Sequence, residues 1–78
     1  MNNHRDIEIF CHNIAFLRKQ HKLSRKEMAK RLGIGVWSLV KIEQGLFPPR
    51  LGCNIVFCVY KQFRIRPSQL FSSPLSDV

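Results

Sequence analysis

Apolar residues recur along most of this chain at the three- and four-residue spacing of an amphipathic helix, whereas alternating strand patterns are scarce. The pattern therefore predicts an all-α fold. The first helix is expected to start at Asp6, whose carboxylate suits an N-cap, and to run to about Gln20. Its buried stripe consists of Ile7, Phe10, Ile14 and Leu17.

The second helix has the clearest start signal in the sequence. The run Ser24-Arg-Lys-Glu27 is a capping box, in which the serine hydroxyl and the glutamate carboxylate each accept a hydrogen bond from the other residue's backbone amide. Gly33 provides the left-handed residue at which many helices end. A helix this short is not stable alone, so we expect it to pack on its neighbours. Its inward face consists of Met28, Ala29 and Leu32.

A third helix is predicted from Gly35 to Gly45, with Leu39 and Ile42 facing the core. Only one residue separates Gly33 from Gly35, so the second and third helices must cross sharply. Two short helices joined by a tight, glycine-containing turn are typical of a helix-turn-helix, although other small helical domains contain a similar corner.

Two more helices are predicted after Pro48 and Pro49, which restrict the backbone and break the helical pattern. The fourth is expected from Leu51 to Phe63, and the residues expected to face inward are Val56, Val59, Tyr60 and Phe63. This segment has more apolar residues than one stripe can bury, so Cys53, Ile55 or Phe57 must partly face outward.

A fifth, short helix is expected from Pro67, which suits a first turn, to Phe71. Residues 72–78 have no core stripe and are expected to form a loose tail. At 78 residues the chain has room for one small domain. We therefore predict a single compact domain of five helices over residues 6–71.

The charge is strongly positive and unevenly distributed. The formal net charge is +8, and the segment 18–50 alone contains nine basic and two acidic residues. A basic field of this kind favours a polyanionic partner, most often nucleic acid.

The stretch Ile14–Gly45 combines the motifs LR, LSxxEMA, LGI and IExG at spacings that resemble those of the Cro and phage-repressor family, the lambda-repressor-like or XRE-type regulators. This resemblance implies five helices, double-stranded DNA binding through the second and third helices, and usually a homodimer. It also implies an ion pair between Arg18 of the first helix and Glu43 at the end of the third.

In the family, the start of the third helix enters the major groove and reads base edges. The positions expected at the bases are Val36, Trp37, Ser38, Val40 and Lys41. The positions expected at DNA phosphates are Lys22, Arg25, Lys26, Gly35 and Arg50. Arg25 and Lys26 open the second helix, whose N-terminus already favours an anion.

Val36 and Trp37 are apolar, whereas the side chains that usually read bases carry amide, hydroxyl or guanidinium groups. Three interpretations of them remain open: contact with thymine methyl groups, packing into or at the edge of the core, and contact with a partner protein. Trp37 is the only tryptophan in the chain, so the first two predict different fluorescence responses to DNA.

The sequence thus favours a sequence-specific DNA-binding protein, a small transcriptional regulator of phage, plasmid or mobile-element type that acts as a repressor. The alternative is a protein-interaction module or antitoxin of the same fold. We expect no enzymatic activity, because the three histidines are scattered near the first helix without a paired carboxylate or a placed nucleophile around them. We also expect no cofactor, metal site or small-molecule ligand.

The remaining expectations concern location and assembly. Cys11, Cys53 and Cys58 lack metal-ligand spacing and suit a reducing cytoplasm. No apolar run approaches the ~20 residues needed to cross a bilayer, and the first residues lack a signal-peptide pattern. Apolar excess in the fourth-helix region predicts a homodimer contact there.

Overall fold

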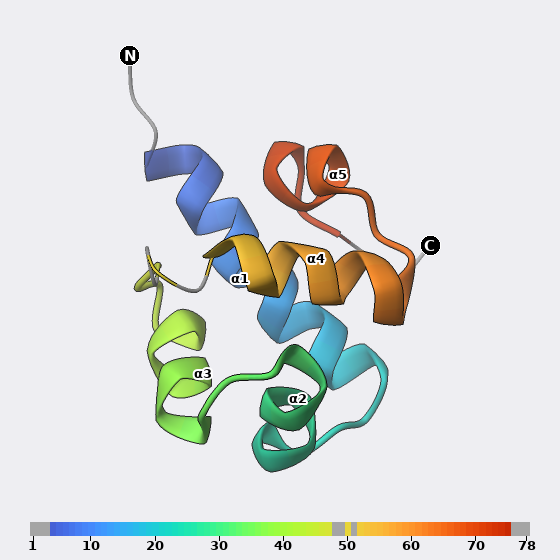
Figure 1. Cartoon of the computed structure of the whole chain (residues 1–78). Coiled ribbons are helices and arrows are strands. Elements are labelled where there is room, and N and C mark those ends of the chain that lie inside the picture. The colour runs from blue at the N-terminus through green and yellow to red at the C-terminus, as the bar shows by residue number, and fades with distance from the viewer. Residues whose placement is uncertain (1–3, 48–49, 51, 76–78) are drawn as a thin grey trace.

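The computed structural model describes residues 4–47, 50 and 52–75, and these residues form five helices without a strand (Figure 1). The helices are α1 (His4–Gln20), α2 (Arg25–Leu32), α3 (Val36–Glu43), α4 (Gly52–Phe63) and α5 (Pro67–Ser72). The predicted all-α, five-helix fold is therefore confirmed. None of the helices in the described ranges is both long and apolar enough to cross a membrane.

The five helices pack against one another around a shared core. Figure 1 shows α2 and α3 together at one end of the molecule, α5 at the other end, and α4 between them. α1 contacts both α3 and α5, α2 contacts α3 and α4, and α4 contacts α5. The helix-turn-helix pair is thus held from behind by α1 and α4.

Phe10 of α1 lies at the centre of the core and is fully buried. Its ring stacks on Phe71 of α5, with centroids 5.0 Å apart, and meets the edge of Phe47, with centroids 5.1 Å apart. Such aromatic pairs add stability beyond the area that they bury. The predicted inward faces of α2 and α3 are confirmed, and so is that of α1 except for Ile7, which is only half-buried. The residues at or below 2% exposure include Phe10, Ile14, Leu17, Met28, Ala29, Leu32, Leu39 and Ile42.

The start of α1 differs from the prediction. The helix already includes His4, so Asp6 lies in its first turn and is not the N-cap. A carboxylate in the first turn still interacts favourably with the positive end of the helix dipole. Aspartate is favourable both at the N-cap and in the first turn, so the sequence pattern could not distinguish the two positions and the predicted helix start was wrong.

Left-handed residues end several helices. Gly33 (φ 71°) and Gly45 (φ 98°) follow α2 and α3, as predicted from their positions. Lys22 (φ 56°) and Arg64 (φ 60°) adopt the same conformation after α1 and α4. A side chain makes this conformation costly, so these two ends were not visible from the sequence.

The inward face of α4 is rotated relative to the prediction. Ile55 and Val59 are fully buried, whereas Tyr60, expected inside, is 46% exposed. Val56 and Phe63 are half-buried, and Cys53 and Phe57 are exposed. Because α4 is apolar on most sides, its contacts with α2 and α5 decide which side is buried, and the sequence alone does not. The predicted start at Leu51 and the proline pair at 48 and 49 lie outside the described residues.

A buried asparagine on α1 holds the end of the chain. Asn13 is 0% exposed, and its Nδ2 donates to the carbonyls of Leu70 at 2.8 Å and Ser73 at 3.2 Å. Its Oδ1 accepts from the backbone amide of Leu75 at 2.9 Å. Leu75 also packs against the core. In the segment expected to be a loose tail, Ser73 and Leu75 are therefore hydrogen-bonded to α1, and residues 76–78 lie outside the described range.

Candidate nucleic-acid interface

The capping box fixes the start of α2. Ser24 Oγ accepts from the amide of Glu27 at 3.1 Å, and Glu27 Oε1 accepts from the amide of Ser24 at 2.9 Å. The hydrogen bond from the Ser24 backbone amide lowers the pKa of the Glu27 carboxyl, and the Ser24 side chain and the charge of Arg31 lower it further. The carboxylate therefore remains ionised and satisfies a backbone amide that would otherwise lack a partner.

The turn between α2 and α3 places the two helices in close contact. Ala29 of α2 is 2% exposed, and its small side chain allows α3 to pack closely on α2. The amide of Ile34 returns to the carbonyl of Ala29 at 3.0 Å and closes the end of α2. Gly35 is the N-cap of α3 and provides no side-chain hydrogen bond there.

α3 has one buried and one solvent-facing side. Leu39 and Ile42 are fully buried and anchor it to the body of the domain. On the other side, Val36 is 40% exposed and Trp37 is 79% exposed, and Lys41 is also exposed. The interpretation of Trp37 as a core residue is therefore wrong, because a core tryptophan has little accessible surface. Ser38 and Val40 are half-buried at the flanks.

Arg18 and Glu43 form an ion pair between α1 and the end of α3. Arg18 Nε donates to Glu43 Oε2 at 2.6 Å, and Nη2 donates to Oε1 at 3.3 Å. Only 14% of the Arg18 side chain and 7% of the Glu43 side chain are exposed. Arg18 Nη1 also donates to the carbonyl of Leu23 at 3.1 Å. One guanidinium thus connects α1, the α1–α2 turn and α3.

Arg25 is a second partner of Glu43 that the sequence did not indicate. Its Nε donates to Glu43 Oε1 at 3.0 Å. Burial raises the pKa of the Glu43 carboxyl, but hydrogen bonds from Arg18 and Arg25 and their charges outweigh that effect, so the pKa lies below its ordinary value. The sequence assigned Arg25 to a phosphate alone. A guanidinium has five N–H donors, so the contact with Glu43 leaves others for an anion.

A helix-turn-helix family model matches residues 14–52, which span the end of α1, both helices of the corner and the chain up to the start of α4. The chain belongs to this helix-turn-helix family. No match was found among curated proteins or solved structures. The family shows that the protein is a DNA-binding transcription regulator of the XRE, lambda-repressor-like type.

The basic side chains expected at phosphates border the helix-turn-helix. Arg25 and Lys26 form the first turn of α2, and Lys22 lies in the turn before it, all three exposed. Arg50, between α3 and α4, is also exposed. At the start of α3, no acidic residue occupies the first turn and no side chain caps the helix. This open helix end favours an anion.

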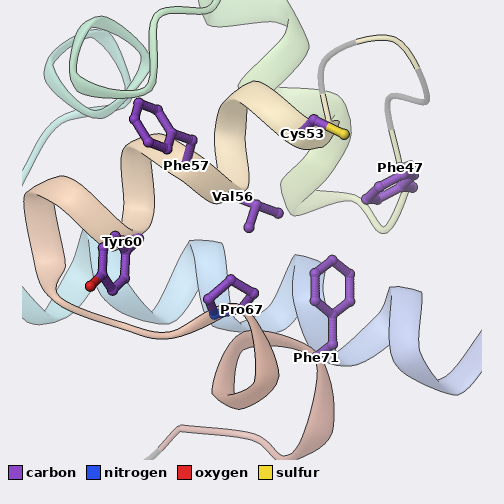
Figure 2. A pocket seen from close by; sticks show the side chains of 7 residues that line it. All are labelled: Phe47, Cys53, Val56, Phe57, Tyr60, Pro67 and Phe71. Carbon is purple, nitrogen blue, oxygen red and sulfur yellow. The ribbon is translucent and has the colours of Figure 1, made fainter.

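A second surface of this helix-turn-helix protein lies between α4 and α5. This surface is an apolar groove with a volume of about 640 Å³, and Figure 2 shows the side chains that line it. The residues that line it are Phe47, Cys53, Val56, Phe57, Tyr60, Pro67 and Phe71. Phe57 is 61% exposed and Tyr60 is 46% exposed. No residue of α2 or α3 lines the groove, so it can be occupied without covering the helix-turn-helix.

Proposed function

We propose that this regulator binds double-stranded DNA sequence-specifically and acts as a small repressor of phage, plasmid or mobile-element type. The observation that carries the proposal is the exposed side of α3. Val36, Trp37 and Lys41 face solvent while Leu39 and Ile42 hold the opposite side in the core. A helix held in this way can enter the major groove without losing its packing.

The charge of the surrounding chain supports the same proposal. Within residues 18–50, nine basic side chains stand against two acidic ones. Both acids are engaged: Glu27 caps α2, and Glu43 pairs with Arg18 and Arg25. The basic side chains around the helix-turn-helix therefore supply most of the affinity by binding DNA phosphates, and α3 supplies the specificity. A cytoplasmic location suits such a function and the three free cysteines.

Binding to duplex DNA should be strongly salt-dependent. With roughly four to six phosphate contacts, the logarithm of the affinity is expected to fall with the logarithm of the salt concentration at a slope of about −4 to −5. Fluorescence anisotropy of labelled duplexes measures this slope. The salt concentration should run from about 50 to about 300 mM, a range that brackets 0.1 M, where charges are screened over ~10 Å.

Two variants test the salt series: Lys26→Ala removes an expected phosphate contact, and Lys61→Ala is the matched control. Lys26 lies in the first turn of α2, whereas Lys61 lies near the end of α4, with its ammonium 5.3 Å from the Phe57 ring. The Lys26 variant should reduce the slope by about 1, and the Lys61 variant should leave it unchanged. If no duplex is bound even at low salt, the α3 face instead binds a protein, as an interaction module or antitoxin would.

We propose further that the α4–α5 groove is the contact between two copies of this chain. Two-fold assembly pairs the same surface on both copies and places two α3 helices on successive turns of the duplex. The groove meets two requirements for this contact: it is apolar with exposed aromatic rings, and it leaves α2 and α3 uncovered. A small apolar ligand in the same groove is the competing occupant.

Phe57→Glu should dissociate the dimer without unfolding the chain. Phe57 is 61% exposed in the single chain, and each copy contributes it to the two-fold contact. The dimer dissociation constant is expected to rise at least tenfold, since burying a phenylalanine is worth about 1.5–3 kcal/mol. Sedimentation equilibrium measures this change, and circular dichroism verifies folding. Val36→Glu is the control: it should weaken DNA binding and leave the dimer intact. A parent chain that is monomeric at all concentrations would refute the proposal.

A further inference from the structure

The exposed start of α3 has an unusual chemistry for a surface that reads bases. Its first two residues are Val36 and Trp37, and together they present apolar surface. Amide and carboxylate groups occur only at the other end of the helix, where Glu43 is held by Arg18 and Arg25 and Gln44 is the C-cap. The first turn therefore offers one indole N–H, one hydroxyl from Ser38, and otherwise hydrocarbon and ring surface.

The partner of this apolar surface must also tolerate a strongly basic environment. The first turn of α3 has no acidic residue, and Arg25, Lys26 and Lys41 lie on the same two helices. A polyanion that also presents apolar groups satisfies both conditions. In the major groove of DNA, the apolar group at the base edge is the C5 methyl of thymine. Cytosine lacks this methyl, but 5-methylcytosine presents it at the same ring carbon.

We infer that Val36 and Trp37 recognise pyrimidine C5 methyl groups as such, so that the protein reads 5-methylcytosine in place of thymine and its DNA binding responds to cytosine methylation. This inference rests on the proposed binding of double-stranded DNA. Lys41 lies one helical turn beyond Trp37 on the same face of α3, which places their Cβ atoms about 5–6 Å apart. Its ammonium suits the O6 and N7 acceptors of guanine. The preferred element is therefore a methylated pyrimidine beside a guanine.

The test uses a 20-base-pair duplex, about two turns of DNA, selected by this protein from a random library, with affinities measured by fluorescence anisotropy. Each thymine of the selected site is replaced in turn by deoxyuridine, which removes only the methyl. At the positions read by α3, affinity should fall about fourfold, the equivalent of about 0.8 kcal/mol for one buried methyl. At the same positions, a C·G pair should bind weakly and a 5-methylcytosine·G pair should regain about fourfold.

Two variants separate this role from general DNA affinity. Trp37→Ala should remove the difference between thymine and deoxyuridine, and also that between 5-methylcytosine and cytosine. Its melting temperature should stay close to that of the parent chain, because the side chain is 79% exposed. Lys41→Ala should weaken binding to all of these duplexes and preserve the ratios between them.

The outcomes distinguish the inference from the function on which it rests. Tight, site-selective binding that is indifferent to every thymine methyl overturns the inference and leaves DNA binding standing. Persistence of the methyl effect in Trp37→Ala also overturns it. Absence of binding to every duplex overturns both. An emission of Trp37 that is solvent-like in the free protein and changes only with methyl-bearing sites supports it independently.

Discussion

Replacing Asn13 with alanine should lower the free energy of unfolding by about 2–4 kcal/mol, a large loss for a domain of this size. The side chain is fully buried and makes three hydrogen bonds to the backbone of residues 70, 73 and 75. Alanine leaves these groups without partners, and the cost of each buried unsatisfied group is about 1–3 kcal/mol. Urea denaturation followed by circular dichroism measures the change.

His12→Ala is the matched control for Asn13→Ala. His12 is its neighbour on α1 and is exposed, so the substitution alters the helix without touching the buried network. It should change stability by less than about 0.5 kcal/mol. A loss below 1 kcal/mol for Asn13→Ala would mean that water replaces the side chain, and that the end of the chain does not depend on it.

Glu43→Ala is expected to cost about 2–4 kcal/mol, because it leaves the largely buried Arg18 guanidinium without its carboxylate. Double-mutant cycles should rank the two arginines. The Arg18–Glu43 coupling is expected to be about 1 kcal/mol or more, and the Arg25–Glu43 coupling about 0.2–1 kcal/mol. The difference follows from exposure, since 53% of the Arg25 side chain is exposed, against 14% for Arg18. Strict additivity of Arg18→Ala and Glu43→Ala would show that the pair does not couple in solution.

The same network predicts a pH dependence. The pKa of Glu43 is lower in the folded protein than in the unfolded chain. Its contribution to stability is therefore complete above the unfolded-state pKa of about 4.3 and is lost as the pH falls through the lower, folded-state pKa. The relevant pH range runs from about 5 to about 2, because it includes the unfolded-state pKa of about 4.3 and the lower folded-state pKa. As the pH falls through this range, the free energy of unfolding should decrease less for Glu43→Gln than for the parent chain. Glu8→Gln, at an exposed position on α1, is the control and should follow the parent.

Much of the fold could be predicted because it depends on local signals. The capping box at Ser24, the glycines at 33 and 45, and the stripes of α1 to α3 apart from Ile7 are confirmed. Each is a property of a few consecutive residues or of one helical face, so no knowledge of the neighbours is needed. The rotation of α4 could not be predicted in this way, because its apolar residues surround the helix and only packing selects Ile55 over Tyr60.

The Arg25–Glu43 contact and the Asn13 hydrogen bonds were missed because the partners are distant in the sequence. Arg25 and Glu43 are 18 positions apart, and Asn13 is 57 to 62 positions from its partners. A signal for Asn13 did exist: it lies three residues after Phe10 and four before Leu17, on the buried face of α1. A polar residue on such a face must find hydrogen-bond partners inside the protein. The sequence indicates that need but does not identify the partners.

The candidate site was partly accessible from the sequence. The resemblance to a known family predicted that α3 faces DNA, and the structure leaves Val36, Trp37 and Lys41 exposed on it. The sequence could not decide whether Trp37 points inward or outward. Leu39 and Ile42 anchor α3, and their spacing in the sequence is compatible with either orientation of Trp37. Its 79% exposure in the folded chain removes that ambiguity.

The contact of Asn13 with the end of the chain also constrains the order in which the molecule assembles. Contacts between α2 and α3 join neighbouring segments, whereas the Asn13 bonds close a loop of at least 57 residues. Closing a long loop costs more entropy than closing a short one, so local pairs form earlier. Until α5 docks, Phe10 lacks the stacked ring of Phe71 and Asn13 lacks its three partners. Residues 70–75 therefore complete the core, and a chain truncated before residue 70 is expected to expose its central aromatic side chain to water.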